Sequence, residues 1–157
     1  MRKRIITGET QGAPSPDEAW LDLESLARVE LTSEDESHPI ESALKAGEGP
    51  GWRAAEPGRQ TVRLLFDEPR RVKRIHLVCH EESQQRTQEV LLRWSTDGGR
   101  SYREIVRQQY NFSPPEATWE IEDFAVEIVG LAVLEILISP DISGGPARAS
   151  IARLRLA

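Results

Sequence analysis

The sequence has a single cysteine, Cys79, so an internal disulfide is impossible. It also lacks any apolar stretch of the roughly 20 residues that a membrane-spanning helix needs. The longest apolar stretch, from Ile128 to Ile138, is interrupted by Gly130 and Glu135. A chain of 157 residues is long enough to bury about 70% of its unfolded surface in one core. These absences predict a single domain, without a membrane span, that is stabilised by packing alone.

We also expect no secretion signal. The first residues, Met1-Arg-Lys-Arg-Ile-Ile-Thr-Gly8, are basic, but the apolar segment of about 7 to 15 residues that a signal needs does not follow. We therefore expect a cytoplasmic protein. The net charge is −6, from 20 basic and 26 acidic residues. Since nucleic-acid binding requires a cationic surface, we predict no nucleic-acid partner. We predict no membrane partner either.

Motifs that carry catalysis are absent too. The sequence contains no nucleophile elbow, no glycine-rich phosphate loop and no HExxH zinc motif. His76, Cys79 and His80 lie close in sequence, but on a strand the two histidines stand about 13 Å apart and Cys79 points to the opposite face. One zinc ion bonds its ligands at about 2.0–2.3 Å, so it cannot take all three. We predict that the protein is not an enzyme, with no catalytic residues and no metal site.

What the sequence does contain is a series of short strand patterns from Thr61 onwards. Apolar and polar residues alternate, so that Val62, Leu64 and Phe66 share one face of a strand. The Asp97 carboxylate, at a tight turn, is expected to bond backbone amides and lock the hairpin. The pattern predicts an all-β fold, an antiparallel β-sandwich. The predicted strands are 29–32, 61–67, 72–80, 88–95, 102–107, 118–122, 131–138 and 149–156.

Before the main strands, the sequence predicts a short helix and a long loop. Residues 1–15 form an expected flexible lead-in, and residues 16–157 form the domain. Ser15, Pro16 and two following acids are favoured at a helix start, so we expect a helix that runs to about Leu26. Residues 33–60 contain three prolines and four glycines, so they are expected to be irregular.

The order of strands and turns predicts where the loops gather. If each strand from Thr61 on runs antiparallel to the one before it, successive loops alternate between the two ends of the sandwich. The tight turns at 67–71 and 96–100 then share one end. The longer loops share the other end: 47–60, 80–87, 109–117 and 140–146. We expect a ligand site at this loop end, where seven candidate side chains collect: Trp52, His80, Glu82, Arg86, Tyr110, Asn111 and Phe112.

The residue types at the loop end are typical of carbohydrate binding. The three aromatic rings offer faces on which sugar rings stack, and the four polar side chains offer donors and acceptors for hydroxyl groups. Pro114 and Pro115 stiffen one loop, which lowers the entropy cost of binding. The alternative is that Tyr110 and Phe112 plug the end of the sandwich and that Trp52 packs the long loop down.

An ordered set of segments covers most of the chain, from about Val29 to Leu156. They are Gly51-Trp52, Val62-Arg-Leu-Leu-Phe-Asp67 with Pro69, Val72-Lys-Arg-Ile-His-Leu77, Leu92-Arg-Trp-Ser-Thr-Asp-Gly98 with Tyr102, Leu134-Glu-Ile-Leu-Ile-Ser-Pro-Asp141, and Ala149-Ser-Ile-Ala-Arg-Leu-Arg-Leu156. In this order they resemble the discoidin (coagulation factor 5/8 type C) family of galactose-binding-like domains. The resemblance implies a jelly-roll β-sandwich of roughly eight or more strands without catalytic machinery. Members of the family bind carbohydrates, lipid head groups, proteins or partner subunits.

Many sugar-binding members of this family hold a structural calcium ion. The resemblance implies that an Asp-Gly step before the loop tryptophan, and a glutamate in the last strand, help to form that site. Here the loop reads Ile40-Glu-Ser-Ala-Leu-Lys-Ala-Gly-Glu-Gly-Pro-Gly-Trp52, without Asp-Gly, and the last strand carries Ala152-Arg153 where the acid is expected. Both departures argue against a structural calcium, and we predict no cofactor.

Two functions remain open on this evidence. The first is a non-catalytic binding module with a carbohydrate ligand, which the composition of the loops favours. The second is a cytosolic adaptor that binds another protein, which the missing secretion signal and the missing calcium residues favour. A concave pocket with one exposed ring would indicate a sugar ligand, and a flat apolar patch of several hundred Å² would indicate a protein partner.

Overall fold

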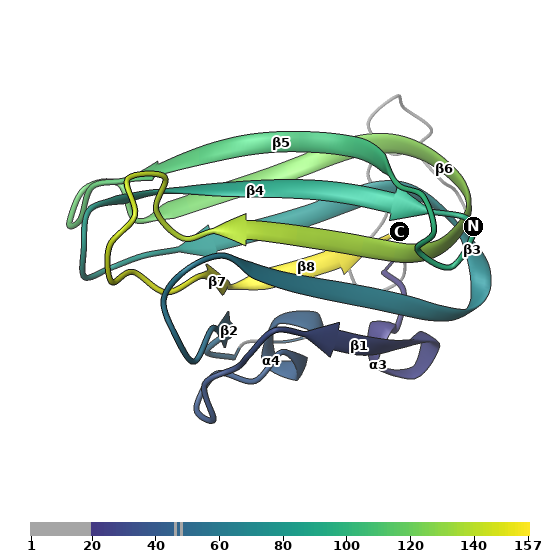
Figure 1. The fold of residues 1–157 in the computed structure, drawn as a ribbon, viewed down its shortest axis with the longest axis horizontal. Coiled ribbons are helices and arrows are strands. Elements are labelled where there is room, and N and C mark those ends of the chain that lie inside the picture. The colour runs from purple at the N-terminus through teal and green to yellow at the C-terminus, as the bar shows by residue number, and fades with distance from the viewer. Residues whose placement is uncertain (1–19, 46, 48) are drawn as a thin grey trace, which may run out of the picture.

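The computed structural model describes residues 20–45, 47 and 49–157 (Figure 1). The predicted lead-in and the predicted helix start lie outside these residues. Within them, no helix is long and apolar enough to cross a membrane. The elements in chain order are α3 (Leu23–Leu26), β1 (Ala27–Leu31), α4 (Glu41–Leu44), β2 (Trp52–Arg53), β3 (Gln60–His80), β4 (Arg86–Ser95), β5 (Arg103–Phe112), β6 (Trp119–Ser139), β7 (Ser150–Ile151) and β8 (Arg153–Leu156).

The pairing of these strands confirms the predicted fold class. All six strand pairings of the described residues are antiparallel. The short helix α3 ends at Leu26, as predicted, but it begins only at Leu23, so residues 20–22 are not helical as the prediction had them. The single turn of helix α4 lies within residues 33–60, the long segment that was expected to be irregular.

Strands β3 and β6 are long and pass through both layers of the sandwich. They pair with each other along their length, with register shifts between Leu65 and Arg74. On the Gln60 side of the shifts, the layer has the order β1-β3-β6-β4-β5. On the His80 side, β3 pairs with β8 instead of β1. Both strands bend around the same end of the molecule (Figure 1), so their two halves enclose one core.

The prediction of a tight turn at residues 67–71 is wrong. The ladder continues there, because Arg70 pairs with Leu131 and Val72 with Ile128, so the two predicted strands belong to one bent strand, β3. In the same way, predicted strands 118–122 and 131–138 are parts of β6. β-Bulges permit this, since an extra residue sharpens the local twist without ending the pairing.

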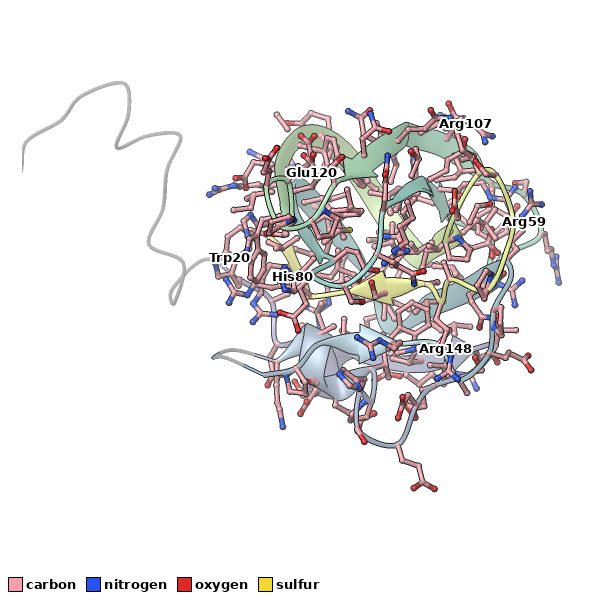
Figure 2. All side chains as sticks on the ribbon, turned by 90° about the vertical axis from the view of Figure 1, so that its left-hand side faces the viewer. Trp20, Arg59, His80, Arg107, Glu120 and Arg148 are labelled. Carbon is pink, nitrogen blue, oxygen red and sulfur yellow. The ribbon has the colours of Figure 1, made fainter. Side chains whose placement is uncertain are left out.

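The bend reverses the chain as a turn would, so the long loops still gather at one end. The Glu81 N–H donates to the Thr118 carbonyl at 2.9 Å, and the Ile142 N–H donates to the Thr87 carbonyl at 2.9 Å. The first bond joins the loops on either side of it, and the second ties the loop after β6 to the start of β4. The loop end lies on the left in Figure 1 and faces the viewer in Figure 2.

The core lies between the two layers. Val62, Leu64 and Phe66 are buried in it, as their alternation predicts. Cys79 is buried there too, and the Gln88 side-chain amide lies 3.5 Å from its sulfur. Burial raises the pKa of the Cys79 thiol to about 12. The thiol is therefore protonated at neutral pH and shielded from solvent.

The turn between β4 and β5 is held by Asp97, which confirms that prediction. Its carboxylate accepts hydrogen bonds from the backbone N–H groups of Arg100 and Ser101, both at 3.0 Å, and from the Ser101 hydroxyl at 2.6 Å. The Ser101 and Ser95 hydroxyls, followed by the backbone N–H groups, hold the pKa of Asp97 well below its usual range. Gly98 and Gly99 follow with positive φ, a backbone conformation that favours glycine.

Candidate functional site

A cleft opens at the loop end of the sandwich, and two of its lining residues, His80 and Arg148, are labelled in Figure 2. It consists of two hollows, of about 230 and 330 Å³, that share four lining residues: Arg53, His80, Glu82 and Ser150. The first hollow is also lined by Glu81, Ser83, Gln84, Arg86, Pro146 and Arg148. The second is also lined by His38, Gly49, Pro50, Trp52, Trp119, Ile151 and Ala152.

Trp119 is the aromatic residue that the cleft presents to solvent. It begins β6, and 56% of it is exposed. Its ring stacks on the His80 imidazole, with centroids 3.9 Å apart and 27° between the planes. His80 Nδ1 lies 3.0 Å from the Thr118 carbonyl, so this nitrogen donates, and Nε2 lies 3.5 Å from the Glu82 carboxylate. His80 therefore covers one part of the Trp119 ring and holds it at the rim of the cleft.

Arg86 lies at the base of the cleft and is almost fully buried. Its Nε donates to Glu81 at 2.6 Å. One terminal nitrogen donates to Gln88 and to the Pro140 carbonyl, and the other donates to the Ser150 hydroxyl, all at 2.8 Å. These bonds join the start of β4 to the 81–85 loop, the end of β6 and β7. Arg86 thus holds together the segments that form the floor of the cleft.

The Glu81 carboxylate is held by the same network. Burial raises the pKa of Glu81, but hydrogen bonds from the Ser83 N–H, the Arg86 guanidinium and the Ser83 hydroxyl outweigh burial and leave the pKa below its ordinary value. Glu81 is therefore ionised at neutral pH. Its charge is matched by Arg86, so neither group contributes a free charge to the cleft.

The prediction that Trp52, Tyr110 or Phe112 offers an aromatic platform is wrong. Their exposed fractions are only 1%, 2% and 1%. Strand β5 runs to Phe112, past the predicted loop start at 109, and its alternation turns Tyr110 and Phe112 into the core. Trp52 borders the second hollow but donates its indole N–H to the Ser33 carbonyl at 3.1 Å. The alternative, in which these rings plug the sandwich end and pack the long loop, is what the structure shows.

The four polar candidates are placed differently from one another. His80 and Glu82 line the cleft, and Glu82 is largely exposed. Arg86 lines the first hollow from its base and is almost fully buried. Asn111 is not among the residues that line the two hollows; it lies on β5 opposite Thr87 and accepts a 2.7 Å hydrogen bond from that hydroxyl. The structure thus brings together three of the four: His80, Glu82 and Arg86.

The cleft residues that the sequence analysis missed include Trp119, Arg53 and Arg148. Arg53 forms no ion pair with any other described residue, and Arg148 lies 3.7 Å from Asp35. The available signal for Trp119 was its place at the end of a predicted loop, next to a strand of alternating acids. The signal for Arg53 was its position directly after the loop tryptophan.

The residues at the expected calcium position do not fit a calcium ion. The Gly51 N–H donates to the Ser42 hydroxyl at 3.0 Å, so that oxygen is already engaged. The carbonyls of Ala43 and Lys45 accept hydrogen bonds from the Arg155 guanidinium. Within the described part of the chain there is no group of three His, Cys, Asp or Glu side chains that could hold a metal ion.

No family model and no curated protein matches this sequence. Solved structures do match the fold. The family 32 carbohydrate-binding module of C. perfringens NanJ, solved in complex with galactose, has a TM-score of 0.65 at 16% identity, covering 88% of this chain and 97% of that one. The F5/8 type C domain of a Bacteroides fragilis protein has a TM-score of 0.60 at 14% identity, covering 88% and 94%.

A third similar structure is that of reduced XRCC1 bound to the catalytic domain of DNA polymerase β, with a TM-score of 0.57 at 19% identity, covering 84% of this chain and 96% of that one. At these identities the likeness establishes the fold. The chain has the galactose-binding-like β-sandwich of F5/8 type C domains and family 32 modules, as its resemblance to the discoidin family implies.

Proposed function

We propose that this chain is a non-catalytic binding module whose ligand is a carbohydrate, held in the cleft at the loop end. The exposed ring of Trp119 at the rim of a polar cleft is the observation that carries the proposal. The apolar face of a sugar ring packs on such an aromatic surface, while convergent polar groups select its hydroxyl groups. The galactose-bound module with the same fold supports this choice of ligand.

Each cleft residue then has a distinct part in recognition. Trp119 stacks on the sugar with the ring surface that His80 leaves uncovered. Arg53 and Arg148 donate hydrogen bonds, and Glu82 accepts them. Arg86 lines the floor of the first hollow, and its part is to position that floor, because its described hydrogen bonds all end on the protein.

The test is a glycan array of the purified chain and of two matched variants. Trp119→Ala removes the ring from the cleft, and we expect it to weaken binding about tenfold or more. Ile121→Ala is the control, because Ile121 lies two residues along the same strand and is 63% exposed, but does not line the cleft. Absence of any glycan signal, or equal loss in the two variants, would contradict the proposal.

A protein partner is the second candidate function. Trp119 and Ile121 are both exposed and separated by two positions on β6, so they project from the same face of that strand. The third similar structure contains a protein complex, which supports this alternative. A protein surface would contact both side chains, so both alanine variants would weaken the interaction. The cytosolic location that suits an adaptor stays a prediction.

A further inference from the structure

Arg155 is a buried arginine on β8. It is 6% exposed. One terminal nitrogen donates to the carbonyls of Ala43 and Leu154, both at 3.1 Å, and the other donates to the carbonyl of Lys45. Three backbone oxygens from two distant segments therefore converge on one positive charge.

This charge has no carboxylate partner among the described residues. Burial lowers the pKa of Arg155, and the neighbouring Arg153 lowers it further. A buried cation without an anion is costly unless its donors are well satisfied. Since the guanidinium keeps its proton at any ordinary pH, the carbonyls must compensate the charge.

The carbonyls themselves need a positive partner. The carbonyls of Ala43 and Lys45 lie at the C-terminal end of α4, where backbone oxygens receive no hydrogen bond from an N–H group of the helix. Converging backbone carbonyls form the kind of oxygen cradle that calcium accepts as a ligand set. In this chain the cradle is filled by a side chain.

We propose that Arg155 is a built-in cation, which holds the 43–45 segment against β8 and removes the need for a structural calcium ion. The segment that follows carries Gly49, Pro50 and Trp52 to the wall of the cleft. The shape of that wall therefore depends on a covalently attached charge and is insensitive to chelators. This inference concerns the scaffold and holds whatever ligand the cleft takes.

The test compares melting temperatures in EDTA and in millimolar calcium chloride. The wild-type chain should melt at the same temperature in both, and calorimetric titration should detect no calcium binding. Arg155→Ala should melt about 5 °C or more below the wild type. Arg153→Ala is the matched control: it removes the adjacent arginine of the same strand, which is only partly buried, and should change the melting temperature little.

Arg155→Glu supplies a readout that a general packing defect would not produce. It places a carboxylate among the same carbonyls, so its melting temperature should rise when calcium replaces EDTA, whereas that of Arg155→Ala should not. Calcium binding by the wild type, an Arg155→Ala variant as stable as Arg153→Ala, or a folded Arg155→Glu variant that ignores calcium would each overturn the proposal. If Arg155→Glu does not fold, the other two measurements decide it.

Discussion

Arg86 directs its described hydrogen bonds to protein groups, although the sequence predicts that it reads a ligand. Two of its four partners, Glu81 and Gln88, are side chains that are themselves buried. An arginine in this setting acts on the cleft by fixing the segments around it. Its loss should therefore appear first as a loss of stability.

We expect Arg86→Met to lower the free energy of unfolding by about 3–5 kcal/mol, because it leaves the Glu81 carboxylate buried without its cation. The double variant Arg86→Met with Glu81→Gln should lose less, since the unpaired charge is gone. Urea unfolding of the wild type and of these two variants measures both effects. A single variant within about 1 kcal/mol of the wild type would show that Arg86 is dispensable to the scaffold.

The Glu81 carboxylate also gives stability a defined pH dependence. Its folded-state pKa is depressed, so its contribution is complete above the unfolded pKa, about 4.3, and is lost as the pH falls through the folded pKa. We expect the stability difference between wild type and Glu81→Gln to be constant above about pH 5 and to shrink towards pH 3. Urea titrations across this range measure it, and a gap that widens in acid would refute the assignment.

At the scale of elements, the short pair β2–β7 closes the base of the cleft. Gly51, just before β2, has φ +76, and a Cβ added there would lie 2.7 Å from the Ile151 carbonyl oxygen and 2.8 Å from the Ala152 Cα. These are backbone atoms, which cannot rotate away. Only glycine lets the chain approach β7 this closely.

We expect Gly51→Ala to separate β2 from β7 and to lower the melting temperature clearly. Gly58→Ala is the matched control, because Gly58 also has positive φ, +94, but an added Cβ would meet nothing within 4 Å. The control therefore carries only the left-handed backbone cost, about 1–2 kcal/mol. Differential scanning calorimetry of both variants measures the difference, and equal losses would mean that the close approach is unimportant.

Strand β5 explains why the aromatic candidates were misplaced. Gln108 to Phe112 resembles a loop because it is polar and precedes two prolines, yet it continues the alternation of the strand. Its pairing with β4, Arg86 opposite Phe112 and Gln88 opposite Tyr110, sets which residues face the core. That pairing joins residues more than twenty positions apart, so local composition does not reveal it.

At the scale of the whole molecule, β3 and β6 belong to both layers of the sandwich. Neither layer can unfold without breaking the ladder that holds the other. We therefore expect a single cooperative transition, with coincident urea curves from tryptophan fluorescence and from far-ultraviolet circular dichroism. Separate midpoints for the two signals would contradict this.

The gathering of loops could be predicted because it depends only on strand order and direction. The face on which Trp119 lies could not. A shift of one residue in the pairing with His80 would turn Trp119 inward and Glu120 outward, since side chains alternate along a strand. This register depends on the pairing of Trp119 with β3, a strand distant in sequence, and that pairing leaves no local mark in the sequence around Trp119.

Because the thiol of Cys79 is buried and protonated, its chemical modification can be used to detect opening of the core. A thiol reagent in native buffer can modify it only during moments when the sandwich separates, so the labelling rate counts those openings directly. Cysteines introduced at the exposed rim of the cleft would react with the reagent at once, while Cys79 would remain unmodified. Dyes can thus be attached beside the cleft without first removing the native cysteine.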